Sequence, residues 1–144
     1  MKYVHNITFS VFVKPEDSLE TIKEQLVNLI PLDIEEEKLQ LIQSVAEGIT
    51  NKIIILEITL KKERHTNAFL DSFKEKLSSE QLEQLRTQEN RLDDQLYYFI
   101  RLDKEKLPEL VLTDSGNCVH IKMSIAAFPK KKENALNIVK ELFN

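Results

Sequence analysis

Alternation of apolar and polar residues predicts β-strands at several places along the chain. At residues 3–13, Ile7 and Phe9 fall on one side and Thr8 and Ser10 on the other. Because successive side chains of a strand point to opposite faces, this pattern is typical of a strand with one buried face. The same criterion predicts further strands at residues 38–46, 52–62, 91–104 and 119–127.

Apolar residues at every third or fourth position predict helices between these strands. In the first helix, Pro15, Glu16 and Asp17 form the expected N-terminus, because the helix dipole favours acidic residues there. Its apolar stripe consists of Leu19, Ile22, Leu26 and Leu29, and Pro31 ends it. Further helices are predicted at residues 65–77, from a cap at Ser78 or Ser79 onward, and at residues 130–143.

The predicted elements follow the order β-α-β-β-α-α-β-β-α. Strands joined by short turns favour an antiparallel sheet, as in the hairpin expected around Gly48 and Asn51. Helices need an apolar surface to cover. We therefore expect an α+β two-layer sandwich, with a mainly antiparallel sheet and helices packed on one of its faces. A chain of 144 residues is expected to form a single domain, residues 1–144.

The strand predicted at residues 91–104 has an aromatic and cationic outer face. Leu96, Tyr98, Ile100 and Leu102 share one side, whereas Tyr97, Phe99 and Arg101 share the other. Aromatic rings beside a guanidinium favour a face that is partly open to solvent. The alternative is that Tyr97 and Phe99 belong to the core and that both faces of the sheet are covered.

Other predicted strands contribute polar side chains that would share this open face. They are Asn6, Thr8, Ser10, Thr59, Lys61, His120, Lys122 and Ser124. Together with the aromatic residues they would form a platform on which bases stack while cations hold the phosphates. Single-stranded or structured RNA is the ligand that such a platform favours.

Basic residues also gather outside the strand faces. One group precedes the last predicted helix and another follows the strand at residues 52–62, and both suit contacts with a sugar-phosphate backbone. The net charge is −4, but residues 1–50 sum to −5 and residues 101–144 to +2. The candidate RNA-binding residues are therefore Lys61, Lys62, Arg64, Tyr97, Phe99, Arg101, Lys122, Lys130, Lys131 and Lys132. Solvated charged faces without a ligand are the alternative.

Residues that mark a reaction are scarce. The two glycines, Gly48 and Gly116, are too few and too far apart for a phosphate-binding loop of a nucleotide enzyme. His5, His65 and His120 lie in separate predicted elements without paired cysteines, so we expect no zinc site and no other cofactor. His5 shares the apolar side of its strand, where we expect it to be buried.

The cellular setting is predicted from what the chain lacks. Cys118 is the only cysteine, so no internal disulfide can form, and we expect its thiol to be packed rather than catalytic. No apolar run approaches the roughly 18 residues of a membrane span. The first residues also lack the apolar core of a signal peptide. We therefore expect a cytoplasmic protein that does not engage a membrane.

Five short segments together carry a family resemblance. The most specific are Arg91-Leu92-Asp93-Asp94 and Phe99-Ile100-Arg101-Leu102-Asp103-Lys104; the others are His5-x-Ile7-x-Phe9, Glu47-Gly48 and Ile125-Ala126-Ala127-Phe128-Pro129. With them the chain resembles, nearly end to end, a small archaeal family of RNA-binding proteins or predicted exosome subunits. The fold of that family is similar to that of the ribosomal protein that binds 5S RNA. The resemblance implies RNA binding without catalysis, with exosome or ribosomal components as possible partners.

The chain departs from the family at the predicted hairpin. The segment Gly48-Ile49-Thr50-Asn51 lacks the second glycine and the proline that the family pattern has in this turn. A close backbone contact with a ligand at this loop is therefore not expected.

Three hypotheses of function follow. The leading one is a non-catalytic RNA-binding protein, an accessory in RNA processing or exosome-linked decay. The second is a protein-interaction module that docks through a sheet edge or forms a homodimer without RNA. The third is a metal-dependent nuclease that uses Asp93, Asp94 and Asp103. Acidic residues at strand ends more often serve the fold, and we expect these three to form ion pairs with Arg91 and Lys104.

Overall fold

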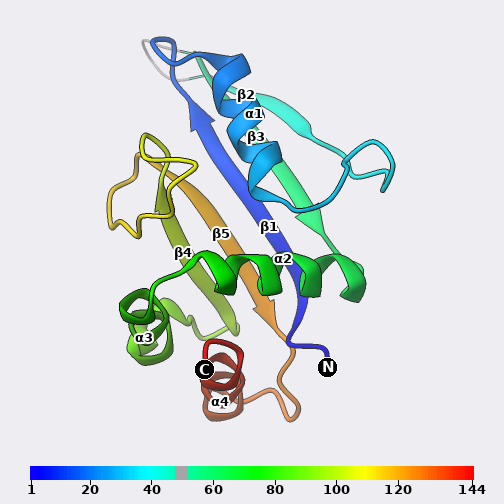
Figure 1. The fold of residues 1–144 in the computed structure, drawn as a ribbon, viewed down its shortest axis with the longest axis vertical. Coiled ribbons are helices and arrows are strands. Elements are labelled where there is room, and N and C mark those ends of the chain that lie inside the picture. Colours follow the sequence, from blue (N-terminus) through cyan, green and yellow to red (C-terminus); the bar gives the residue numbers. More distant parts are fainter. Residues whose placement is uncertain (48–51) are drawn as a thin grey trace. The chain divides into compact units, whose positions relative to one another are not determined.

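The computed structural model describes residues 1–47 and 52–144 and contains one open, five-stranded antiparallel sheet in the order β2-β3-β1-β5-β4 (Figure 1). The prediction of an α+β two-layer sandwich is confirmed. In chain order its elements are β1 (Val4–Val13), α1 (Leu19–Leu29), β2 (Ile42–Glu47), β3 (Lys52–Leu60), α2 (Glu63–Lys76), α3 (Ser79–Thr87), a 3-10 turn (Glu89–Arg91), β4 (Tyr97–Asp103), β5 (Cys118–Ile125) and α4 (Lys132–Leu142). The hairpin turn predicted at Gly48 and Asn51 lies outside the described residues.

Contacts within the chain group its residues into two compact units. Unit 1 consists of Met1–Ile7, Leu60–Ile100 and Lys122–Asn144, and unit 2 of Thr8–Thr59 and Arg101–Ile121. Strands β1, β3, β4 and β5 contribute residues to both units. That residues 1–144 form a single domain stays a prediction.

The core of unit 1 is aromatic. Phe69 and Phe73 of α2 stack with ring centres 5.2 Å apart. Tyr98 of β4 is fully buried; its ring lies 5.9 Å from that of Phe143, and its hydroxyl donates a 2.6 Å hydrogen bond to the backbone carbonyl of Leu85 in α3. Burial of a hydroxyl is favourable only when such a partner is present, so this bond fixes the position of α3 against β4.

Helix α3 begins where the sequence predicts. The Ser78 hydroxyl accepts a hydrogen bond from the backbone amide of Gln81, and the Gln81 side chain accepts one from the amide of Ser78. This reciprocal capping box satisfies two amides that a helix N-terminus otherwise leaves without partners. Ser78, of the two predicted alternatives, is therefore the cap.

Helix α1 of unit 2 begins later than predicted. Its cap is Ser18, whose hydroxyl accepts a hydrogen bond from the amide of Thr21, so Pro15, Glu16 and Asp17 precede the helix. The carboxylate of Asp17 instead accepts hydrogen bonds from the amide of Lys14 and from the ammonium of Lys104. The predicted stripe is otherwise correct, because Ile22, Leu26 and Leu29 are buried.

Strands β2 and β3 of unit 2 form the predicted antiparallel pair, with Ile42 opposite Glu57 and Glu47 opposite Lys52. The start of the first of these strands was predicted too early, at residue 38. Lys38 has a φ of 56°, a left-handed conformation that a strand does not contain, and residues 33–39 form turns in which Asp33 accepts backbone amides.

The predicted alternation is confirmed in β4, in β5 and in β1 from Ile7 onward, whereas the side chains of residues 42–46 in β2 are all exposed. In β4, Tyr98, Ile100 and Leu102 are buried, while Tyr97, Phe99 and Arg101 retain solvent exposure. Strands β1 and β5 repeat the pattern, with Ile7, Phe9, Val11, Val13, Val119, Ile121, Met123 and Ile125 buried. The side chains of Thr8, Ser10, Thr59, His120, Lys122 and Ser124 on the opposite face of the sheet are half-buried. The alternative in which Tyr97 and Phe99 are core residues is therefore wrong.

Candidate nucleic-acid interface

Charge is divided unevenly between the two units. Unit 1 contains 13 lysines and arginines against 10 aspartates and glutamates, a net charge of +3. Unit 2 contains 7 and 14, a net charge of −7. Because local fields rather than the total charge steer an anionic partner, phosphate groups are favoured at unit 1. Of the ten predicted RNA-binding residues, nine lie in unit 1 and Arg101 lies in unit 2.

On the sheet face of unit 1, a lysine is paired with an aromatic ring. The ammonium nitrogen of Lys122 in β5 lies 4.1 Å from the centre of the Tyr97 ring in the neighbouring strand β4. A cation over a ring face is attracted by the ring quadrupole, so the two side chains hold each other in place. Both are half-buried, which leaves part of the ring and part of the ammonium open to a ligand.

Phe99 follows Tyr97 on the same face of β4 and is also half-buried. The guanidinium of Arg91 donates a hydrogen bond to the backbone carbonyl of Phe99. It donates another to the side chain of Gln88, which fixes the position of the guanidinium. Arg91 therefore supports the strand that carries both aromatic residues. Two adjacent rings with a cation fit the stacking of successive bases.

Exposed cations surround the first turn of α2. Lys61, Lys62 and Arg64 are all exposed, and Lys62 occupies the cap position without a side-chain hydrogen bond to the helix. The partial positive charge of a helix N-terminus makes this an unfavourable place for lysine unless an anion is nearby, although Glu63 offsets part of it. The placement fits a phosphate contact at the helix end.

The same arrangement recurs at α4. Lys130, Lys131 and Lys132 are exposed, and Lys131 is the cap residue. The ammonium of Lys132 lies 3.7 Å from a carboxylate oxygen of Asp94, but Asp94 is 98% exposed, so the pair is strongly solvated and weak. Neither Lys130 nor Lys131 forms an ion pair within residues 1–47 and 52–144. These lysines are thus available to phosphates.

The N-terminal segment connects the two basic groups. The backbone carbonyl of Met1 accepts a hydrogen bond from Asn67 in α2, so the segment lies against the first part of that helix (Figure 1). His5 is exposed, not buried as predicted from the alternation. Partial desolvation, and then the positive charges of Lys2 and Lys130, lower the pKa of His5 from its ordinary value of 6.5. The positive charges of Lys2 and Lys130 therefore act together on the His5 imidazole.

The reason for the wrong prediction at His5 is a change of phase in β1. Val4 and Ile7 are both buried although three positions separate them, so the alternation that holds from Ile7 onward does not extend to His5. The exposed imidazole joins the lysines instead of the core.

Phe128 is a residue that our reasoning from sequence missed. It is 94% exposed, more than any other large hydrophobic residue of the described chain, and it directly precedes Pro129 and the three lysines. The available signal was an aromatic residue outside any alternating pattern, next to a run of cations.

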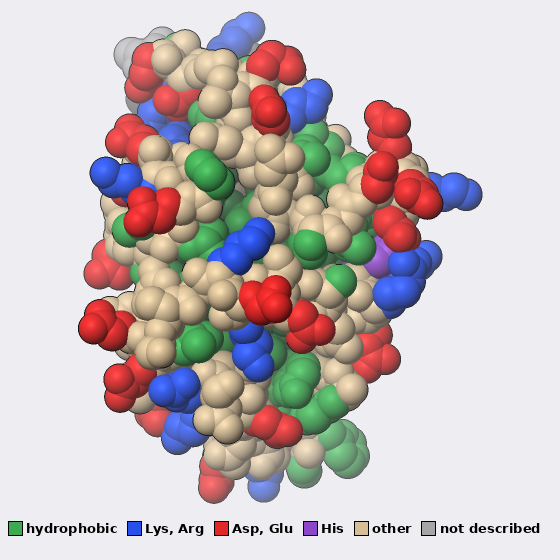
Figure 2. Space-filling view, viewed as in Figure 1, with side chains coloured by type: hydrophobic (Ala, Val, Ile, Leu, Met, Phe, Trp, Pro, Cys, Tyr) green, Lys and Arg blue, Asp and Glu red, His purple; other side chains and the backbone are tan. Residues whose placement is uncertain are grey.

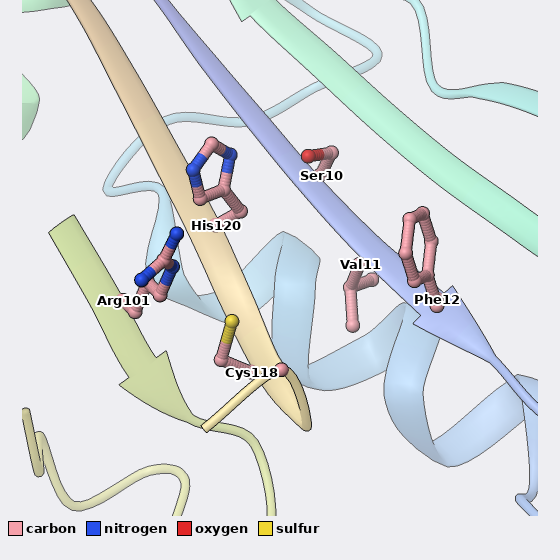
Figure 3. A pocket seen from close by; sticks show the side chains of 7 residues that line it. Ser10, Val11, Phe12, Arg101, Cys118 and His120 are labelled. Atoms are coloured by element: carbon pink, nitrogen blue, oxygen red, sulfur yellow. The ribbon is translucent and has the colours of Figure 1, made fainter. Parts of the chain in front are cut away.

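Arg101 lines a cavity of about 240 Å³ in unit 2 (Figure 3). The cavity is lined by Ser10, Val11, Phe12, Arg101, Gly116, Cys118 and His120. Figure 3 shows the Arg101 and His120 side chains close together on adjacent strands, with Phe12 on β1. Burial raises the pKa of the Cys118 thiol, so the thiolate that a nucleophile requires is disfavoured. Because unit 2 is acidic, a phosphate contact is less favoured at Arg101 than at the lysines of unit 1.

Two aspartates of the family motifs, Asp93 and Asp103, accept hydrogen bonds from backbone amides. In unit 1, Asp93 accepts hydrogen bonds from the amides of Gln95 and Tyr97 and so stabilises the turn in which Leu96 has a φ of 67°. In unit 2, Asp103 accepts one from Glu105.

Our prediction that Asp93, Asp94 and Asp103 form ion pairs with Arg91 and Lys104 is wrong. Lys104 pairs with Asp17, Asp94 pairs with Lys132, and Arg91 binds Gln88 and the backbone of Phe99. Among residues 1–47 and 52–144, no group of three or more His, Cys, Asp or Glu side chains is arranged to hold a metal ion.

The face visible in Figure 2 carries Lys and Arg side chains interspersed with Asp and Glu. It is not a broad basic surface.

Comparison with known proteins identifies the family. A family model described as RNA binding matches residues 6–125. The chain belongs to this RNA-binding family. An RNA-binding protein of Pyrococcus abyssi is 28% identical over 141 residues, which cover 95% of this chain and 92% of the relative.

Two solved structures are similar to this chain over nearly their whole length. A DUF54 protein of Archaeoglobus fulgidus is 27% identical with a TM-score of 0.84, covering 96% of this chain and 99% of that one. A DUF54 protein of Methanothermobacter thermautotrophicus is 28% identical with a TM-score of 0.79, covering 99% of each chain. None of the helices in the described part of the chain is both long and apolar enough to cross a membrane.

Proposed function

We propose that this chain binds RNA through the cationic and aromatic side chains of unit 1 and catalyses no reaction on it. The observation that carries the proposal is the concentration of positive charge in unit 1, +3 against −7 in unit 2, in a chain that is acidic overall. The name of the Pyrococcus relative and the RNA-binding family support the same ligand.

Within unit 1, different side chains contact the bases and the phosphates. Tyr97 and Phe99 stack on bases, and Lys122 holds the Tyr97 ring while it contacts a neighbouring phosphate. The lysines and arginine at the starts of α2 and α4 bind the backbone without reading the sequence, because contacts with phosphate carry no base information. They are Lys61, Lys62, Arg64, Lys130, Lys131 and Lys132.

We further propose that the protein acts in the cytoplasm as an accessory to RNA processing or exosome-linked decay. This finer role rests on the family resemblance of the sequence. Its test is co-purification from cells in which RNA has been digested, because a partner that is lost on digestion was held by RNA alone.

The test of RNA binding is a titration of a fluorescently labelled single-stranded RNA with the full chain, followed by anisotropy at several salt concentrations. Binding through phosphates requires log affinity to fall linearly with log salt. An affinity that does not depend on salt would contradict the proposal. The same RNA incubated with the protein and Mg²⁺ or Mn²⁺ should stay intact, and cleavage would instead support the nuclease hypothesis.

A second candidate function, protein docking, is favoured by the exposed edge strand β2. Ile42 and Val45 are 52% and 56% exposed, and β2 has a neighbour on one side only. An edge strand with exposed apolar residues is a template for the addition of another strand. The occupant that fits an isolated edge of this kind is a second copy of the chain or a partner's extended segment.

Replacing Val45 by Lys distinguishes this candidate from RNA binding. A lysine on an edge strand discourages strand addition, so a dimer measured by sedimentation would dissociate while RNA affinity stays unchanged. A wild-type chain that remains monomeric at every concentration, and in the presence of cell extract, would remove the docking hypothesis.

A further inference from the structure

One aromatic side chain of unit 1 is exposed to a degree that its own packing does not explain. Phe128 is 94% exposed, whereas Phe69, Phe73 and Phe143 in the same unit are buried. Leaving a ring of this size in water forgoes the free energy that burial would provide. A ligand that covers the ring when it binds would recover this free energy.

The backbone around Phe128 is constrained by hydrogen bonds. On the N-terminal side, the amide of Ala126 donates to the carbonyl of Tyr3 over 2.9 Å. On the C-terminal side, the carbonyl of Pro129 accepts bonds from the amide of Lys131 and from the side chain of Asn134. The ring therefore projects from a backbone that is bound to Tyr3, the residue before β1, and to the start of α4. A side chain held in this way loses less conformational entropy when a ligand covers it.

The charges near Phe128 select the kind of ligand. Lys130 follows two residues later, and its positive charge acts on His5 together with that of Lys2. Lys2 and His5 lie on either side of Tyr3 in the sequence, and the Tyr3 carbonyl binds Ala126, two residues before Phe128. An exposed ring on a segment next to cationic and titratable side chains favours a polyanion with flat apolar groups. Protein docking would instead require a contiguous apolar patch.

We propose that Phe128 stacks on an unpaired base of single-stranded RNA while Lys2, His5 and Lys130 contact the adjacent phosphates. The proposal rests on the RNA-binding function proposed above and assigns to it a contact that lies outside the strand faces. Stacking on an aromatic side chain tolerates any base, because every base has a π face. The site therefore discriminates unpaired from paired RNA rather than one sequence from another.

Replacing Phe128 by alanine tests the inference. The dissociation constant for a single-stranded RNA 12-mer should rise about 5- to 150-fold, the range expected for one lost base stack. The affinity for a perfectly paired RNA duplex should stay unchanged, because its bases are not accessible. The matched control is Phe12→Ala, which removes an exposed phenylalanine of the acidic unit 2, 51% exposed, and should change neither affinity.

A fluorescent variant gives an independent readout. The chain contains no tryptophan, so Phe128→Trp introduces the only one, and stacking on a base should quench its emission when single-stranded RNA is added. The emission of Phe12→Trp should not be quenched. Because the residue at position 128 is almost fully solvent-exposed, both variants at this position should keep the wild-type circular dichroism spectrum.

The possible outcomes separate this inference from the function on which it rests. If wild-type protein binds single-stranded RNA but Phe128→Ala binds it equally well, and RNA leaves the emission of Phe128→Trp unchanged, the stacking role is wrong and RNA binding stands. If Phe128→Ala weakens duplex and single strand alike, the ring does not read unpaired bases and the inference is also wrong. If the wild-type chain binds neither RNA, the proposed function itself fails.

Discussion

The ammonium nitrogen of Lys104 lies 2.9 Å from the carboxylate oxygen Oδ2 of Asp17, and it also donates a hydrogen bond to the backbone carbonyl of Phe12. Lys104 is 5% exposed, so this single side chain joins the end of β4 to the end of β1 and to the segment before α1. A buried lysine requires such partners, because an ammonium without them would lose its hydration uncompensated.

Replacing Lys104 by methionine should lower the free energy of unfolding by about 3 kcal/mol, since it leaves the Asp17 carboxylate and the Phe12 carbonyl without their donor. Chemical denaturation at neutral pH measures the loss. Lys106→Met, at an exposed neighbouring position, is the control and should be neutral. Equal stability of the two variants would show that the ion pair contributes nothing.

The same contact predicts how stability depends on pH. The hydrogen bond from the Lys14 amide, and then that from Lys104, lower the pKa of Asp17 from its ordinary value of 3.8. A carboxyl with a lowered pKa in the folded state stabilises it above the unfolded pKa, and this contribution is lost as pH falls through the folded pKa. Wild-type protein should therefore lose more stability than Lys104→Met between neutral pH and strongly acidic solution. Parallel pH profiles would contradict this assignment.

Two substitutions at Tyr97 distinguish the contribution of its ring to RNA affinity from that of its hydroxyl group. Tyr97→Leu should weaken binding of single-stranded RNA by about 1–3 kcal/mol, because it removes a stacking surface, whereas Tyr97→Phe should retain most of the affinity. Neither substitution changes the charge of the site, because Lys122 is retained in both variants. Anisotropy titrations measure the difference. If leucine and phenylalanine are equivalent at this position, Tyr97 does not stack on a base.

Charge reversal at the start of α4 should weaken RNA binding without regard to sequence. The triple variant Lys130→Glu, Lys131→Glu and Lys132→Glu should reduce the slope of log affinity against log salt by about two, since each phosphate contact on a single strand contributes about 0.7. The matched control reverses Lys38, Lys52 and Lys106, three exposed lysines of the acidic unit 2, and should leave the slope unchanged. Identical slopes for both triple variants would exclude the α4 lysines from the interface.

RNA binding should depend on pH through His5. In the free protein, desolvation, Lys2 and Lys130 lower the pKa of His5 below 6.5, so the imidazole is neutral at physiological pH. A nearby phosphate favours the protonated form and raises this pKa in the complex. Affinity should therefore rise as pH falls through the range between the two pKa values, and His5→Asn should remove this rise. Binding that is independent of pH in the wild type would place RNA away from His5.

Local pattern was sufficient for most of the elements. The period of two in β4 and β5 and the capping box at Ser78 are properties of a few neighbouring residues. They led to the two strands and to the right helix start, although β4 begins at Tyr97 and not at residue 91 as predicted. The errors came where a local signal competed with a distant partner. Asp17 resembles an acidic helix start but binds Lys104, 87 positions away in the sequence, and Lys38 adopts a turn within an apparently alternating stretch.

The candidate site was predictable only in part. The half-buried aromatic face with Tyr97 and Lys122 follows from alternation, because one covered face of a sheet implies one less covered face. The pairing of Lys122 with the Tyr97 ring depends on which strands are neighbours. Likewise, the sequence shows that Phe128 stands beside a run of cations but not that its ring is exposed, and His5 looks buried until the change of phase after Val4 is known.

The sequence by itself determined the order of the elements, the faces of the strands and the types of residue available for an anionic ligand. These properties depend on the periodicity of neighbouring side chains and on composition, which no later folding step alters. Only the tertiary structure decided which charges meet: it separated a positive unit from a negative one and brought Lys2, His5 and Lys130 together. Such proximity is set by the path of the whole chain, so no short stretch of residues contains it.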